Sequence, residues 1–260
     1  EMYAVVIAGG IPAPGEPLYE YTQGQSKALL DIVGKPMIQW VLDALSGAGT
    51  VDEVVVMGVS AEADLHCSKP ITYMPNQGEM LQNILYGIRK VLEIAPTASH
   101  ALIVSSDIPA ITPEAVDWVA NTALATNHDI YYNVIRREVM EKRFPGSRRS
   151  YARLKEMEVC GGDLNVVRTL TATGKDELWR RIIDSRKSAF KQASLLGFDL
   201  FFLLMLRQLT LEQAERKVSK RLGLRGKVLV CPYAEVGMDV DKPHQLELLR
   251  ADLAKQVVLA

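Results

Sequence analysis

Apolar runs and helical spacings alternate along the chain, and this alternation predicts a parallel α/β fold. Residues 4–8 are apolar at every position, as in a central strand buried on both faces of a parallel sheet. Residues 36–45 then carry apolar side chains at helical spacing. The pattern continues with strands at 52–59, 71–74, 100–105, 129–135 and 227–230, and helices at 80–92, 112–125, 193–222 and from 243 onward.

This order of elements predicts a three-layer α/β sandwich with a mostly parallel, Rossmann-like sheet and helices on both faces. Thr112 and Pro113 are suited to the N-cap and first position of the helix at 112–125. Residues 136–190 are basic and irregular at first, then helical. No internal repeat or linker divides the sequence, so we expect one domain over residues 1–260.

Composition narrows the class of protein. The chain has 260 residues, and its net charge of −1 gives no general attraction to nucleic acid or to an anionic membrane. Cys67, Cys160 and Cys231 lack metal-ligand spacing, which indicates buried free thiols in a reducing compartment. A strand begins at the N-terminus without a signal peptide, so we expect a cytoplasmic protein.

The most apolar stretch, residues 193–209, is too short for a transmembrane helix and is interrupted by Asp199. A buried helix or a homodimer contact is the favoured interpretation. Contact with a membrane surface is the alternative.

The first candidate site joins a glycine turn to a lysine. Gly9 and Gly10 follow the first strand, and their backbone N–H groups can approach a phosphate closely. Lys27 can add a point charge at the same phosphates. The spacing matches neither a Walker P-loop nor a dinucleotide fingerprint. An ordinary connection with an exposed lysine is the alternative.

The second candidate is a single aspartate, and the third is a pair of aspartates. Asp107 follows a buried strand, where it can hold a hard cation or cap a turn. Asp239 and Asp241 are two apart, so a strand would place both on one face. Paired carboxylates there require a cation or a basic group between them, although Asp241 is also placed to cap the following helix.

Weaker candidates lie in predicted loops, and a solvated turn is the alternative for each. Asn76 and Gly78 open a helix and can read the edge of a base. The others can contact an acceptor substrate, through close backbone approach or through bidentate bonds to a phosphate: Gly161, Gly162, Arg148 and Arg149. The four histidines show no ligand spacing and receive no role.

Taken together, these motifs resemble the nucleotidyltransferases of the MobA-like NTP-transferase superfamily. The resemblance covers residues 1–135 and 230–255. It implies a variable acceptor-binding part at 136–225. One feature of the family is missing: its glycine loop usually contains an arginine, but no arginine or lysine occurs here between Ile11 and Ser26. The matching segments are Ala8-Gly9-Gly10, Lys27-Ala28-Leu29, Gly34-Lys35-Pro36, Ser105-Ser106-Asp107-Ile108-Pro109 and Asp239-Val240-Asp241-Lys242-Pro243.

The resemblance implies a transferase that moves an NMP group from an NTP to a small phosphorylated acceptor and releases pyrophosphate. It implies Mg²⁺ held by Asp107 with Asp239 or Asp241, nucleotide contacts from Ala8, Gly9 and Gly10, and catalytic roles for Lys27 and Asp107. A nucleotide-sugar-dependent glycosyltransferase is one alternative, because Asp239-Val240-Asp241 matches an Asp-x-Asp motif. A non-catalytic nucleotide-binding regulatory domain is another.

Overall fold

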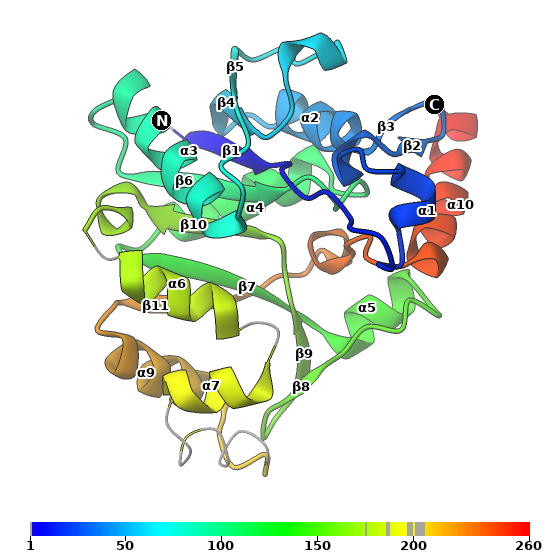
Figure 1. Ribbon diagram of the computed structural model, residues 1–260. Coiled ribbons are helices and arrows are strands. Elements are labelled where there is room, and N and C mark those ends of the chain that lie inside the picture. The colour runs from blue at the N-terminus through cyan, green and yellow to red at the C-terminus, as the bar shows by residue number, and fades with distance from the viewer. Residues whose placement is uncertain (1, 175, 186–187, 197–199, 201–205) are drawn as a thin grey trace.

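The structure is a computed structural model that describes residues 2–174, 176–185, 188–196, 200 and 206–260. A central sheet runs through the molecule with helices on both sides (Figure 1). The strands are β1 Met2–Ile7, β2 Asp31–Ile32, β3 Lys35–Pro36, β4 Val51–Met57, β5 Ile71–Met74, β6 His100–Ser105, β7 Ile130–Arg136, β8 Ala152–Arg153, β9 Glu158–Gly161, β10 Leu164–Arg168 and β11 Gly226–Val230. The α-helices are α1 Tyr19–Thr22, α2 Met37–Gly47, α3 Met80–Ile94, α4 Pro113–Leu124, α5 Arg137–Arg143, α6 Asp176–Ser185, α7 Ala189–Leu196, α9 Leu211–Leu222 and α10 Pro243–Leu259.

The described strands of the main sheet follow the order β5-β4-β1-β6-β10-β7-β9-β8, and β11 pairs with β7. The pairs β5–β4, β4–β1, β1–β6 and β7–β11 are parallel. β10 lies antiparallel between β6 and β7, and β9 is antiparallel to β7. β2 and β3 form a separate two-stranded sheet. The prediction of a mostly parallel sheet is therefore confirmed, with antiparallel strands at one side.

Alternating side chains of β1 separate the two faces of the sheet. Ala4 and Val6 pack in a core with α2, α4 and α10, whereas Tyr3 and Val5 pack toward α3 on the other face. This alternation follows from the two-residue period of a strand. The three layers predicted from the sequence are confirmed.

For several elements, the ends predicted from the sequence agree with those in the structure. The strands at 71–74 and 100–105 have the predicted bounds, and the Thr112 hydroxyl accepts a hydrogen bond from the Ala115 N–H at the start of α4. Cys67, Cys160 and Cys231 are free thiols as predicted, although Cys67 is only partly buried. Burial raises the pKa of the Cys231 thiol to about 11.

Two segments differ from the prediction. Residues 136–190 contain α5 and the strands β8, β9 and β10. The sequence analysis did not predict these elements, because they are short and lie among basic residues. The predicted helix at 193–222 is wrong over residues 206–210, where the chain turns and Thr210 caps a new helix, α9. Its hydroxyl accepts from the Gln213 N–H and the Gln213 side chain accepts from the Thr210 N–H, which sets the start of α9.

The apolar stretch at 193–209 is only partly described, since 197–199 and 201–205 lie outside the described residues. Ala193, Leu200 and Leu209 are buried, as a core segment requires, while Leu206 is exposed. Among the described helices none combines the length and apolarity needed to cross a membrane.

Candidate active site

A cavity of about 710 Å³ opens at the carboxyl ends of β1 and β6. This is the edge where ligands bind in open parallel sheets. Its lining includes the glycine turn after β1, Lys27, the segment that opens α3, and Asp107. Residues far apart in the sequence therefore meet at one site, as the sequence predicted for them.

The glycine turn is shaped by close packing on one side and open space on the other. A Cβ on Gly9 would lie 2.6 Å from Asn76 Oδ1 and from Asn83 Nδ2, so a larger residue does not fit without displacing both amides. At Gly10 the same position meets nothing within 4 Å. Gly9 thus allows the approach of the 76–83 segment, and Gly10 leaves room for a ligand.

Asn76 links the glycine turn to α3. Its Nδ2 donates to the Gly9 carbonyl at 3.0 Å, and its Oδ1 accepts from the Gly78 N–H at 3.0 Å and from Asn83 Nδ2 at 3.1 Å. Gly78 has φ +92°, a left-handed conformation that favours glycine. The predicted nucleotide-binding residues Gly9, Asn76 and Gly78 lie together. Asn83, which the sequence analysis did not single out, is bonded to Asn76 and lines the cavity.

Two hydrogen bonds join the end of the 11–26 loop to the glycine turn and so place Lys27 beside it. The Lys27 N–H donates to the Gly10 carbonyl at 2.9 Å, and the Ser26 hydroxyl donates to the carbonyl of buried Ala8 at 2.9 Å. The Lys27 ammonium then donates to Asp107 Oδ2 at 2.6 Å, to the Val240 carbonyl at 2.9 Å and to Asp241 Oδ1 at 3.4 Å. The alternative of a plain exposed lysine is wrong.

The pKa of Lys27 is governed by opposing influences. Burial, the largest single influence, lowers it, but the charges and hydrogen bonds of Asp107 and Asp241 together outweigh burial and raise the pKa above its usual value of 10.5. Lys27 is therefore a cation at neutral pH.

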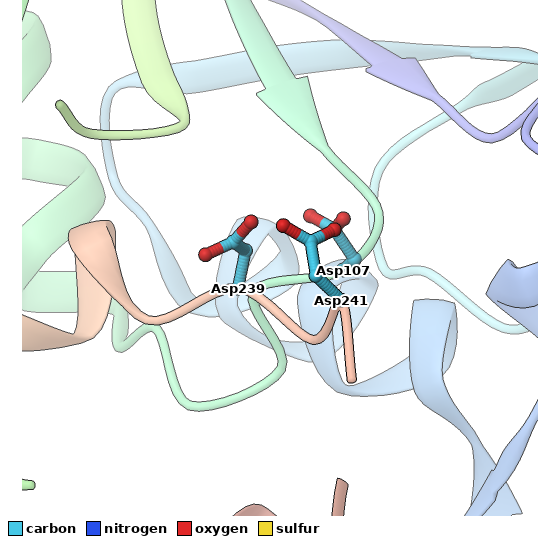
Figure 2. A group of neighbouring side chains, drawn as sticks. All are labelled: Asp107, Asp239 and Asp241. Carbon is cyan, nitrogen blue, oxygen red and sulfur yellow. The ribbon is translucent and has the colours of Figure 1, made fainter. Parts of the chain in front are cut away.

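The three candidate carboxylates converge (Figure 2). One carboxylate oxygen from each of Asp107, Asp239 and Asp241 lies within 4.8 Å of the other two. Asp107 accepts from the Ser105 hydroxyl at 2.5 Å, and its carbonyl accepts from the Val240 N–H at 3.0 Å. This backbone bond holds the late segment against the end of β6.

The local structure around Asp239 and Asp241 differs from the prediction in two ways. The segment is not a strand: it follows the 3-10 helix Ala234–Gly237 as irregular chain without ladder pairing. Asp241 does not cap α10, since Lys242 is the N-cap residue and Gln245 Oε1 accepts from the Asp241 N–H at 2.8 Å. The Asp241 carboxylate is left to face Lys27.

Arg149 forms an ion pair with Asp239, and both side chains are largely buried, at 14% and 13% exposure. Arg149 thus supplies the basic group that the paired carboxylates required. Arg148 has φ +55° and lines a second cavity, of about 650 Å³, together with Arg149. Of the two predicted acceptor-binding arginines, one is committed to the carboxylate cluster.

Gly161 and Gly162 are packed tightly against neighbouring side chains. A Cβ on Gly161 would lie 1.9 Å from the Tyr132 hydroxyl oxygen, and one on Gly162 would lie 2.8 Å from Val236 Cγ1. Neither glycine lines the 710 Å³ cavity, but the next residue, Asp163, does.

The donor set and the charge of the cavity fit a divalent cation. Carboxylate oxygens are the ligands that Mg²⁺ prefers. Among the described lining residues there are six acidic and three basic side chains, a formal excess of three negative charges. The acidic ones are Glu79, Asp107, Asp163, Asp184, Asp239 and Asp241, and the basic ones are Lys27, Arg180 and Lys191.

Arg180 and Lys191 line the cavity, although the sequence analysis did not single them out. They lie on α6 and α7, in the part of the chain where the sequence showed only a basic helical pattern. Helical spacing places Arg180, Ile183 and Asp184 on one side of α6, but the spacing alone does not show that this side faces a cavity.

Comparison with known proteins agrees with the family resemblance found in the sequence. The family model of the MobA-like NTP transferase domain matches residues 4–193. A 3-deoxy-manno-octulosonate cytidylyltransferase of Geotalea uraniireducens (strain Rf4) is 28% identical over 251 residues, covering 91% of this chain and 96% of the relative.

Solved structures agree on the fold. A hypothetical transferase from Thermus thermophilus superposes with a TM-score of 0.81 at 34% identity, covering 95% of this chain and 99% of that one. A CMP:2-keto-3-deoxy-manno-octonic acid synthetase complexed with CTP superposes with a TM-score of 0.61 at 18% identity, covering 98% and 100%.

Proposed function

The chain belongs to the family of MobA-like NTP transferase domains, and on that premise we propose that it transfers a nucleotidyl group from an NTP to a phosphorylated acceptor. The observation that carries the proposal is the convergence of Asp107, Asp239 and Asp241 beside the glycine turn, where the Lys27 ammonium is bonded to Asp107 and Asp241. The site therefore combines a fixed ammonium and fixed carboxylates with the backbone at Gly10, which a phosphate can approach.

In the proposed reaction an acceptor phosphate oxygen attacks the α-phosphorus of the NTP. A new P–O bond forms, the bond from the α-phosphorus to the α,β-bridging oxygen breaks, and its electron pair leaves with pyrophosphate. An ionised acceptor phosphate needs no general base. The protein's contribution is therefore positioning and charge stabilisation.

Individual residues have distinct roles in this proposal. Gly9 and Gly10, which follow Ala8, present backbone to the nucleotide. Lys27 is held by Asp107 and Asp241 and stabilises negative charge that develops on the phosphates. Asp107, Asp239 and Asp241 would hold Mg²⁺, which when bound supplies Lewis-acid charge at the phosphate oxygens.

Substrates are proposed from the relatives and from the second cavity. CTP is the first nucleotide to test, because the curated relative is a cytidylyltransferase. We propose that the segment from Asn76 to Gly78, which is hydrogen-bonded to the glycine turn, contacts the base. Four arginines and two glutamates line the second cavity, and this excess of positive charge supports a phosphorylated acceptor. Arg137 and Arg153 pair with Glu158, so Arg148 is the arginine proposed to contact the phosphate.

The test is pyrophosphate release from the four NTPs against a panel of phosphorylated acceptors, with Mg²⁺ and with a chelator. We expect release with CTP that is abolished by the chelator. Release of a nucleoside diphosphate from a sugar nucleotide, without pyrophosphate from any NTP, would instead establish the glycosyltransferase alternative. Tight NTP binding without turnover on any acceptor would establish the regulatory one.

A further inference from the structure

One wall of the 710 Å³ cavity is built by α6 and α7. Arg180, Ile183 and Asp184 line it from α6, and Lys191 lines it from α7. The three α6 residues share a side of the helix, because residues three and four apart are neighbours on a helical surface.

Packing of the adjoining apolar side of α6 fixes this wall, and Ile183 belongs to both sides. Trp179, Ile182 and Ile183 cluster with Leu81 and Leu85 of α3. The Trp179 side chain is 7% exposed, and its indole N–H donates to the Thr171 carbonyl at 3.0 Å. A helix anchored in this way holds Arg180 at the mouth of the site.

Binding of a triphosphate in this cavity requires positively charged side chains. A triphosphate carries several negative charges into a lining that already has an excess of negative charge. Lys27 is occupied by Asp107, Asp241 and the Val240 carbonyl, and the loop from Ile11 to Ser26 has no basic residue. Within the described lining, the other cations are Arg180 and Lys191.

Both cations are available to a ligand. Lys191 forms no ion pair with the described residues. Arg180 pairs with Glu79 at 3.2 Å, but the two side chains are 41% and 52% exposed. Water screens such a pair, so it is weak. Phosphate oxygens offer the planar guanidinium two parallel hydrogen bonds, a stronger interaction.

We propose that Arg180 and Lys191 bind the β- and γ-phosphates of the nucleotide, which become the leaving pyrophosphate. This inference rests on the proposed function, since it assigns the polyphosphate end of that substrate. On binding, Arg180 exchanges its contact with Glu79 for the phosphates. The α6–α7 wall thereby supplies the positive charge that the glycine loop lacks.

The experiment measures equilibrium binding to the full chain, without acceptor and in excess Mg²⁺. The probes are tripolyphosphate, CTP and CMP, and the variants are Arg180→Ala and Lys191→Ala. The matched control is Arg181→Ala, which removes an equal charge from the neighbouring, exposed position of α6 that does not line the cavity.

We expect Arg180→Ala to weaken tripolyphosphate and CTP binding by about 10- to 100-fold, because it removes charge-assisted hydrogen bonds. Lys191→Ala, which removes a single point charge, should weaken both by about 3- to 10-fold. CMP binding and the Arg181→Ala variant should change by less than about twofold. Melting temperatures of all variants check that the fold is retained.

Unchanged tripolyphosphate affinity in both cavity variants overturns the inference, and so does an equal loss in Arg181→Ala. Because no turnover is measured, the assay separates this inference from the proposed function. A wild-type protein that binds CTP through Arg180 yet releases no pyrophosphate supports the inference and contradicts the function. A wild-type protein that binds none of the probes overturns both.

Discussion

The two walls of the cavity differ in how their charged groups are held. At the ends of β1 and β6, Lys27 and Asp107 are largely buried and joined by a short ion pair. On the α6 wall, Arg180 is 41% exposed, and among the described residues its ion-pair partner is the exposed Glu79. The first wall resembles a rigid catalytic centre, in which each group depends on its neighbours. The second resembles a binding surface whose charges act nearly independently.

Asp107→Asn tests the rigid wall with the largest expected effect. Turnover should fall by about 1000-fold or more, because the change weakens the hold on Lys27 and removes a proposed Mg²⁺ ligand. Pyrophosphate release measures it, with the melting temperature as a check on folding. Asp184→Asn, the matched acid on the α6 wall, should stay within about threefold of wild type. Similar losses in both variants would erase the distinction between the walls.

Lys27→Met keeps the length of the side chain but removes its charge. We expect turnover to fall by about 100-fold, since developing negative charge loses a fixed cation. Stability should fall as well, because Asp107 stays buried beside Asp241. The folded-state pKa of Lys27 is raised, so its stabilisation is complete below pH 10.5 and is lost as the pH rises through the higher folded value.

The pH dependence of Lys27→Met is read from denaturant unfolding between pH 7 and 11.5. The difference in unfolding free energy between wild type and variant should be constant up to about pH 10 and shrink above it. A difference that grows above pH 10 would contradict the assignment of Lys27 as the cation of the cluster.

Arg149→Met removes the partner of a largely buried carboxylate, Asp239. Unfolding free energy should fall by about 3 kcal/mol without Mg²⁺. Added Mg²⁺ should restore part of this loss by binding the released carboxylate, which denaturant unfolding at several Mg²⁺ concentrations measures. Arg148→Met, the adjacent arginine with the same loss of charge, should cost less than about 0.5 kcal/mol. Equal costs would mean that the ion pair with Asp239 contributes nothing.

Glu79→Gln has the smallest expected effect and acts on the α6 wall. It removes the competitor for Arg180, so tripolyphosphate should bind about two- to fivefold more tightly in a titration with excess Mg²⁺. Gln77→Glu, an added charge two positions away on a residue that does not line the cavity, is a control for general charge effects. Weaker binding in Glu79→Gln would mean that this carboxylate positions Arg180 rather than occupying it.

The same contrast explains what the sequence predicted. Gly9 and Asp107 follow buried strands, whose apolar runs mark strand ends and so place polar residues at the ligand edge. Lys27 begins the 3-10 helix Lys27–Leu29, and the motif that contains it was the signal in the sequence. The convergence of Asp239 and Asp241 on Asp107 was predicted correctly, but for the wrong reason. The segment is held by the hydrogen bond from the Val240 N–H to the Asp107 carbonyl, not by strand pairing.

The α6 wall could not be predicted in the same way. Arg180 and Lys191 are among many basic residues in this half of the chain, and their sequence neighbours do not show which of them face a cavity. That depends on tertiary packing of Trp179 and Ile182 against α3, which local patterns do not encode. The pairing of Arg149 with Asp239 is a contact between residues 90 positions apart, and it was missed for the same reason.

The antiparallel strand β10 has a consequence for biosynthesis. β6 pairs with β1 on one side and with β10 on the other, yet β10 is translated well after β6. At about 5–20 residues per second, the roughly 60 residues between them take about 3–12 s to emerge. During that interval the edge of β6 is an unpaired, apolar template for intermolecular strand pairing. Nascent chains stalled before Leu164 should therefore depend on chaperones, whereas chains stalled after Arg168 have a covered edge.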